Sequence, residues 1–170
     1  MAKLRPGRCV REKKRPWTRE SRKKPREGYV KGVPPTRIRR FVTGTKKEYD
    51  MSFYLVSNSD LQVRDNALEA ARVAISNYLQ KNIKQNFYLV LRKYPFQVLR
   101  EHKQAAVAGA DRFFSGMRHA FGKPAGRAVI LNKGEILFEL KIDKKYEKLA
   151  KEAFKRATAK LPGDYKFVAV

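Results

Sequence analysis

Cysteine and histidine are almost absent from this chain. Cys9 is the single cysteine among 170 residues, and His102 and His119 are the two histidines. One cysteine excludes an internal disulfide and fits a reducing compartment such as the cytoplasm. Because Cys9 stands more than ninety positions before either histidine, the three residues lack the spacing of a zinc site. We therefore expect no metal and no other cofactor.

Long hydrophobic runs are also missing. No apolar stretch approaches the roughly 20 residues that a helix needs to span a bilayer. Residues 1–10 contain no apolar core of the kind found in secretory signals. Neither of the two helices expected below is basic on one face and broadly apolar on the other, as helices that lie on membranes are. These absences predict a cytoplasmic protein with no membrane partner.

The motifs of common enzyme classes are absent too. Asp111 has no second carboxylate at a spacing useful for acid–base catalysis. The pair Gly122-Lys123 is followed by Pro124, where a phosphate-binding loop requires Ser or Thr. Ser115 lacks the flanking residues of a nucleophile elbow. The sequence therefore predicts a protein that is not an enzyme.

Positive charge is abundant. Lys and Arg number 40 against 16 acidic residues, which gives a formal net charge of +24. So large an excess opposes compaction through self-repulsion, and a permanent polyanionic partner would relieve it. Nucleic acid is the usual partner of this kind. Hydrophobic residues still make up 42% of the chain, which argues against full disorder.

Residues 1–36 are predicted to form a basic RNA-binding arm. The first 40 residues hold 16 Lys and Arg, 3 acidic residues and 5 prolines, a composition that favours extended chain over helix. A disordered solubilising tail would have the same composition; alternatively, the arm orders against phosphates, with Trp17 or Tyr29 stacking on bases or packing at the domain edge. The candidate rRNA-binding residues of the arm are Arg5, Arg8, Arg11, Lys13, Lys14, Arg15, Trp17, Arg22, Lys23 and Lys24.

Residues 37–170 are predicted to form a single α+β domain, in which two helices pack on one face of a mainly antiparallel sheet. One-sided apolar spacing predicts helices over 65–82 and 144–160. Asn66 and Glu69 have the spacing of a capping box, although Asp65 could equally be the cap. Apolar and aromatic runs predict strands at 38–42, 51–56, 87–92 with a continuation past Pro95 through Phe96 and Val98, 128–131, 135–141 and 165–168. Asn132-Lys133-Gly134 predicts a hairpin between two of them.

A long internal loop at about 101–127 is the most informative segment. It shows neither helical nor strand periodicity, and loops of this length inside a domain are usually functional or disordered. Its arginines can fork onto phosphates, and its flat rings can stack on splayed nucleotides. The alternative for Phe113, Phe114 and Phe121 is that they anchor the loop to the core.

The same loop carries a family resemblance. Residues 108–112 (AGADR) and 115–124 (SGMRHAFGKP) resemble the signature of the large-subunit ribosomal protein family called L-ten-e in archaea and eukaryotes and L-sixteen in bacteria. Residues 94–100 (YPFQVLR), 68–72 (LEAAR) and 5–9 (RPGRC) resemble other parts of that family. The basic, proline-rich content of residues 12–30 is similar to the archaeal type.

The resemblance implies partners and a site. It implies binding to large-subunit rRNA near the peptidyl-transferase centre, with neighbouring ribosomal proteins and aminoacyl-site tRNA as further partners, and a loop that points toward the tRNA acceptor end. Carried over by motif, the residues expected near RNA are Arg100, Lys103, Arg112, Arg118, His119 and Lys123.

Two functions remain open on these residues. The first is a structural constituent of the large ribosomal subunit that helps position tRNA. The alternative is a free RNA- or tRNA-binding factor that acts transiently on the ribosome. A constituent would be stoichiometric in washed large subunits, whereas a transient factor would be soluble alone and would co-purify only in part.

Overall fold

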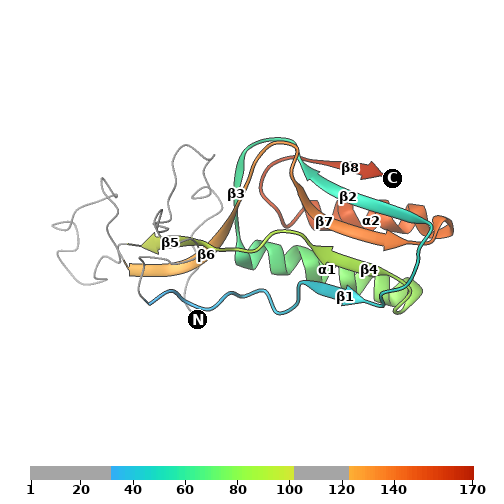
Figure 1. The fold of residues 1–170 in the computed structure, drawn as a ribbon, viewed down its shortest axis with the longest axis horizontal. Coiled ribbons are helices and arrows are strands. Elements are labelled where there is room, and N and C mark those ends of the chain that lie inside the picture. The colour runs from blue at the N-terminus through green and yellow to red at the C-terminus, as the bar shows by residue number, and fades with distance from the viewer. Residues whose placement is uncertain (1–31, 102–122) are drawn as a thin grey trace.

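A computed structural model describes residues 32–101 and 123–170 of the chain (Figure 1). The predicted arm, residues 1–36, therefore lies almost entirely outside the described residues, as do residues 102–122 of the predicted loop. The elements, in chain order, are β1 (Val42–Gly44), β2 (Met51–Ser57), β3 (Leu61–Arg64), α1 (Asp65–Ile83), β4 (Tyr88–Leu91), β5 (Gln97–Glu101), β6 (Lys123–Leu131), β7 (Ile136–Ile142), the 3-10 turn η3 (Lys144–Tyr146), α2 (Glu147–Thr158) and β8 (Tyr165–Ala169).

The strands form two sheets. The larger has the order β1-β4-β7-β2-β8, and the smaller has the order β3-β6-β5. Every pairing between these described strands is antiparallel. Figure 1 shows α1 and α2 along the same side of the larger sheet, with the smaller sheet beyond its end. The predicted α+β class, with two helices on one face of an antiparallel sheet, is confirmed.

Alternation along the strands selects the face that the helices cover. Phe53 of β2 lies opposite Leu140 of β7, and Leu55 lies opposite Phe138, so these side chains share one face. All four are almost fully buried. Phe167 of β8 stacks on Phe53, with ring centroids 5.1 Å apart. Burying one such side chain stabilises the fold by roughly 1.5–3 kcal/mol, so this apolar face determines where the helices pack.

Both helices present apolar stripes to that face. Leu68, Ile75 and Leu79 of α1 recur at helical spacing and are fully buried. Phe154 of α2 meets the ring of Phe167 edge-on at 5.6 Å. The helix positions predicted from periodicity are confirmed, with the first turn of the second helix wound as a 3-10 turn.

The predicted hairpin around Asn132-Lys133-Gly134 is wrong in its pairing. The turn exists, with Gly134 at φ 84°, but β6 belongs to the small sheet and β7 to the large one. The chain passes between sheets here, as it does between β2 and β3. Asp60 joins the two crossings, because its carboxylate accepts a hydrogen bond from the Lys133 N–H at 2.8 Å. Local turn chemistry predicted the bend, but long-range pairing decided the partners.

The predicted strand at 38–42 and the helix cap are also corrected. The strand is β1, at residues 42–44, and the chain before it runs beside α1. Two carboxylates of α1 bind this segment: Asp65 accepts the Arg37 N–H at 3.0 Å, and Glu69 accepts the Arg39 N–H at 3.4 Å. Since these donors are used by the helix, they are not available to a sheet. Neither Asn66 nor Asp65 caps α1, which begins after Arg64 without a side-chain cap.

Glu69 should stabilise the protein in a pH-dependent way. Its carboxylate binds the Arg72 guanidinium through two contacts of 2.6 and 2.9 Å, and this hydrogen bonding lowers the pKa of Glu69 against the opposing effect of burial. A lowered pKa adds stability above the unfolded value near 4.5, and that stability is lost as the pH falls through the folded value. Glu69→Gln should therefore reduce the free energy of unfolding by about 1–2 kcal/mol at pH 7, and by much less at pH 3.

Urea unfolding at the two pH values measures this effect. Glu147 is the matched control, because it pairs with Lys151 at 2.7 Å on the exposed face of α2. Glu147→Gln should change stability less than Glu69→Gln at pH 7. An equal loss for Glu69→Gln at both pH values would contradict the assigned role of its ionised form.

Candidate nucleic-acid interface

β5 and β6 hold the two ends of residues 102–122 together. In their antiparallel register, Glu101 lies opposite Lys123, and Arg100 lies opposite Pro124. Residues 123–127 were assigned to the loop because their sequence lacks periodicity. In the structure they belong to a strand. This part of the loop prediction is wrong because strand pairing, rather than local pattern, orders the backbone there. Whatever residues 102–122 contact, they leave and re-enter the small sheet at adjacent positions.

Two predicted site residues, Arg100 and Lys123, lie close together on these strands. Lys123 is exposed, whereas Arg100 is partly buried and interacts within the protein. The other four loop candidates lie outside the described residues: Lys103, Arg112, Arg118 and His119. The ten arm candidates lie outside them too: Arg5, Arg8, Arg11, Lys13, Lys14, Arg15, Trp17, Arg22, Lys23 and Lys24.

Arg127 binds within the protein. Its Nε donates to the carbonyl oxygen of Pro34 at 2.8 Å, and its Nη1 donates to the Tyr94 hydroxyl at 3.1 Å. It thereby joins β6 to the last residues of the predicted arm. The predicted loop at 101–127 included Arg127 as its last residue. In the structure Arg127 lies on β6, and its side chain binds these neighbours instead.

Two exposed aromatic rings near these strands were not among the predicted site residues. Tyr94 is 49% exposed and Phe96 is 50% exposed. Tyr94 is held from two sides, because Phe41 stacks on its ring at 5.5 Å and Arg127 binds its hydroxyl. An exposed ring that is held in place beside a cation, as Tyr94 is beside Arg127, can stack on an unpaired base. The sequence signal was the proline between the two aromatics, which interrupts the strand pattern and leaves these rings outside the core.

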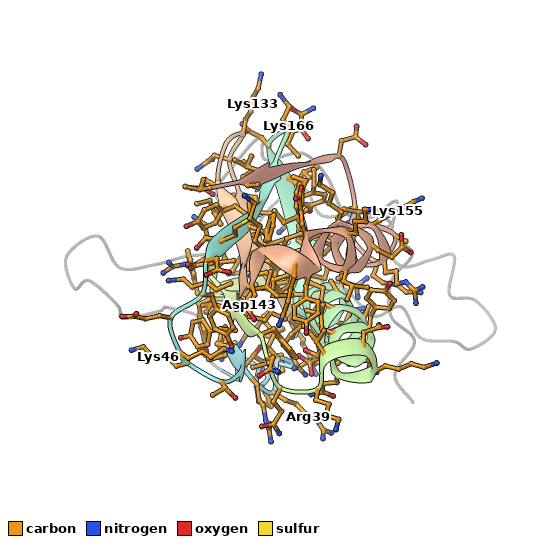
Figure 2. The ribbon with its side chains drawn as sticks, turned by 90° about the vertical axis from the view of Figure 1, so that its right-hand side faces the viewer. Arg39, Lys46, Lys133, Asp143, Lys155 and Lys166 are labelled. Atoms are coloured by element: carbon orange, nitrogen blue, oxygen red, sulfur yellow. The ribbon has the colours of Figure 1, made fainter. Side chains whose placement is uncertain are left out.

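The second helix adds a row of exposed lysines. The apolar stripe of α2 faces the core, so the cations that fall off this stripe point to solvent. Lys151 pairs with Glu147, but Lys148 and Lys155, and Lys160 just after the end of α2, have no acidic partner among the described residues. Figure 2 shows exposed cations on several sides of the molecule, with Lys155 at one side, Arg39 at the lower edge and Lys133 and Lys166 at the top.

Most glutamates in the described part of the chain are already paired within the protein. The ion pairs are Glu69–Arg72, Glu139–Arg92, Glu135–Lys93, Glu147–Lys151 and Glu152–Arg156. Their charges are thus locally cancelled, and the surplus of Lys and Arg sets the sign of the surface potential. Such a surface attracts a polyanion.

Two searches complete the survey of residues 32–101 and 123–170. They contain no group of three or more His, Cys, Asp or Glu side chains that could hold a metal ion. They also contain no helix long and apolar enough to cross a membrane.

Comparison with known proteins supports these observations. The family model described as ribosomal protein L16p/L10e matches residues 13–168. A protein of Sulfolobus acidocaldarius named large ribosomal subunit protein uL16 is 45% identical over 164 residues, which cover 94% of this chain and 89% of the relative. Proteins of the same name from Metallosphaera sedula and Methanococcus maripaludis are 42% and 39% identical, covering 98% and 97% of this chain and 94% and 93% of their own lengths.

A basic α+β scaffold with internally paired acids and exposed cations defines a class of protein that assembles with a polyanion. The extent of the family match makes the assignment specific. The chain belongs to the ribosomal protein L16p/L10e family. It is therefore a structural constituent of the ribosome and not an enzyme, as the sequence predicted.

Proposed function

We propose that this protein is built into the large subunit of the cytoplasmic ribosome, where it binds rRNA near the peptidyl-transferase centre and helps position aminoacyl-site tRNA. The relatives at 39–45% identity are named as large-subunit proteins. The observation that carries the tRNA role is the pairing of Glu101 with Lys123. A strand pair that fixes both ends of a segment reduces the ways in which its cations can be presented.

The proposal divides the work between three parts of the chain. The arm of residues 1–36 and the exposed lysines of α2 neutralise phosphates, which gives affinity independent of sequence. The two sheets and the helices form a rigid platform. The loop cations meet the tRNA end or nearby rRNA, where arginine forks can bind phosphates in two-point contacts; they are Arg112, Arg118, His119, Lys103 and Lys123.

Family membership favours this constituent over a transient RNA- or tRNA-binding factor. A structural constituent must remain bound through successive rounds of translation, which requires contacts over much of its surface. Exposed lysines on α2 and exposed aromatics at the small sheet lie on different elements, as extended embedding in RNA would require. Its presence at one copy in each salt-washed large subunit would support the assignment, and recovery only in the wash would refute it.

The loop arginines provide the sharpest test of tRNA positioning. Arg112→Ala combined with Arg118→Ala should leave the protein folded and incorporated, but should slow accommodation of aminoacyl-tRNA by about tenfold. This loss, about 1.4 kcal/mol, is close to the contribution of one charge-assisted hydrogen bond. Single-turnover dipeptide formation on reconstituted or mutant ribosomes would measure the rate.

A charge-preserving variant separates geometry from electrostatics. Arg112→Lys with Arg118→Lys keeps both charges but cannot form the two-point guanidinium contact. If geometry matters, this variant should be slow as well. A normal accommodation rate in the double alanine variant would show that the loop cations do not position tRNA.

A further inference from the structure

A cleft lies between α1 and the chain segment that leads into β1. Its volume is about 270 Å3, and its walls include Arg39, Arg40, Arg72, Ser76, Asn77 and Gln80. The helix residues stand one and two turns apart, so they line the cleft along roughly 12 Å of α1. No residue of the predicted arm or loop site belongs to these walls. We call this feature the α1 cleft.

The floor of the α1 cleft is rigid. Arg72 is buried, and Glu69 holds its guanidinium through two contacts of 2.6 and 2.9 Å. Its remaining nitrogen, Nη1, donates to the Thr43 hydroxyl at 3.2 Å. The positive charge of Arg72 is thus balanced by Glu69, and the residue joins α1 to the β1 segment. Any ligand of the cleft would meet a floor that is already ordered, which lowers the entropy cost of binding.

One end of the α1 cleft is cationic. Arg39 and Arg40 are consecutive and exposed, and no ion pair to a described residue engages either side chain. Figure 2 shows Arg39 at the edge of the molecule, extending into solvent. The guanidinium groups of two consecutive residues that line one cleft suit a phosphate, because each can fork onto its oxygens.

The other end requires a different ligand group. Ser76 is 4% exposed, and its hydroxyl has no hydrogen-bond partner among the described residues. Asn77 and Gln80 lie exposed beside it on α1. Hydroxyl and amide groups both donate and accept hydrogen bonds, whereas a phosphate ion at neutral pH is mainly an acceptor. A ligand that matches this wall carries donors and acceptors together, as the edge of a nucleobase does.

We propose that the α1 cleft binds one unpaired nucleotide of RNA, with its phosphate between Arg39 and Arg40 and its base edge toward Ser76, Asn77 and Gln80. The inference rests on the proposed binding of rRNA and adds a specific site to it. An acidic peptide could satisfy the two arginines, but it would leave the amide and hydroxyl wall unused. The volume also exceeds what a phosphate alone fills, and it lies just below the range of about 300 Å3 and upward that is typical of small-molecule sites.

Titration of the full chain with mononucleotides tests the site, because the signals that are followed come from side chains of the cleft and not from the arm. Uridine and adenosine 5′-monophosphates should produce saturable shifts in the side-chain amide NMR signals of Asn77 and Gln80. Ser76→Ala should weaken this binding about five- to tenfold, which is the usual effect of losing one hydrogen bond. The same variant should fold at least as stably as the parent, because the removed hydroxyl has no partner to lose.

Control probes distinguish the other occupants. Inorganic phosphate that shifts both amides as strongly as the nucleotides would reduce the cleft to an anion site and overturn the proposal. Saturation by a tetraglutamate peptide at lower concentration than the nucleotides would assign the cleft to a protein contact. Arg39→Ala with Arg40→Ala should abolish nucleotide binding, whereas the charge-matched control Lys46→Ala with Lys133→Ala, which alters exposed lysines away from the cleft, should not (Figure 2).

Failure of this inference is separable from failure of the proposed function. If the unaltered chain binds rRNA with a steep salt dependence but mononucleotides leave Asn77 and Gln80 unshifted, the cleft is not a nucleotide site and rRNA binding stands. If rRNA binding does not depend on salt, the electrostatic basis of the proposed function fails, whatever the cleft binds.

Discussion

Deleting residues 1–30 is expected to weaken binding to large-subunit rRNA by several orders of magnitude in low salt, while the rest of the chain stays folded. The deletion removes 12 of the 40 Lys and Arg side chains. Each phosphate contact contributes about 0.7–0.9 to the slope of log affinity against log salt. If half of these cations contact phosphates, the slope should become shallower by roughly 4 to 5. Filter binding between 50 and 300 mM salt would measure both quantities.

The fold should survive the deletion because the core lies elsewhere. The buried cluster begins at Ile38 and extends to Leu161, so no member of it is removed. Far-ultraviolet circular dichroism and the thermal midpoint should therefore change little. A second variant, in which residues 1–30 are shuffled at constant composition, keeps the charge of the arm but changes its sequence. Full rRNA affinity in this variant would mean that the arm acts only by neutralising phosphate charge. An unchanged salt slope after deletion would refute the phosphate-binding role of the arm.

Among the glycines that the structure describes, Gly44 is expected to lose the most stability on substitution by Ala, more than about 3 kcal/mol. Gly44 ends β1 at φ 94°, and a Cβ built there would lie 1.9 Å from the carbonyl oxygen of Phe87. That oxygen also accepts the Thr45 N–H at 2.9 Å, so moving it breaks a second contact. The displaced β1 would carry Thr43 away from Arg72 and open the α1 cleft. Chemical denaturation measures the loss.

Gly134→Ala is the matched control. Gly134 has a similar φ of 84°, but nothing lies within 4 Å of its added Cβ. Gly134→Ala should lower the free energy of unfolding by about 1–2 kcal/mol, which is the cost of placing a side chain on a left-handed backbone. The difference between the two variants isolates the clash with Phe87. If both variants lose the same stability, the backbone at Gly44 moves away from Phe87 at little cost. Nucleotide binding in the α1 cleft should then be unaffected.

The local sequence pattern was sufficient to predict the positions of the helices and of most strands. The one-sided apolar spacing of α1 and α2 reports a contact surface directly, because 3.6 residues make a turn whatever the partner is. β2 and β8 were equally clear from their apolar and aromatic content. Such patterns give the wrong secondary structure where a backbone N–H group donates to a side chain that is far away in the sequence. Residues 38–42 were predicted as a strand, yet Glu69 binds the N–H of Arg39, and Asp65 binds the N–H of Arg37 just before it.

The candidate site divides in the same way. Cationic arm and loop residues could be predicted because charge and residue type are visible without coordinates. Tyr94 and Phe96 required the structure, since only their exposure separates a stacking surface from core aromatics. Ser76 required it as well, because a serine on an amphipathic helix carries no signal until its hydroxyl is found buried without a partner in a cleft that two exposed arginines also line.

By itself, the sequence determined the polyanionic partner class, the α+β composition and the family, because charge, periodicity and motifs are properties of residues in order. Tertiary structure alone decided that β6 and β7 separate into different sheets, that Glu101 and Lys123 meet, and that Arg127 binds inward. The physical reason is that hydrogen bonds between strands join residues that are far apart in the chain. Which strands pair therefore depends on the whole fold, and the sequence of a single strand does not specify its partner.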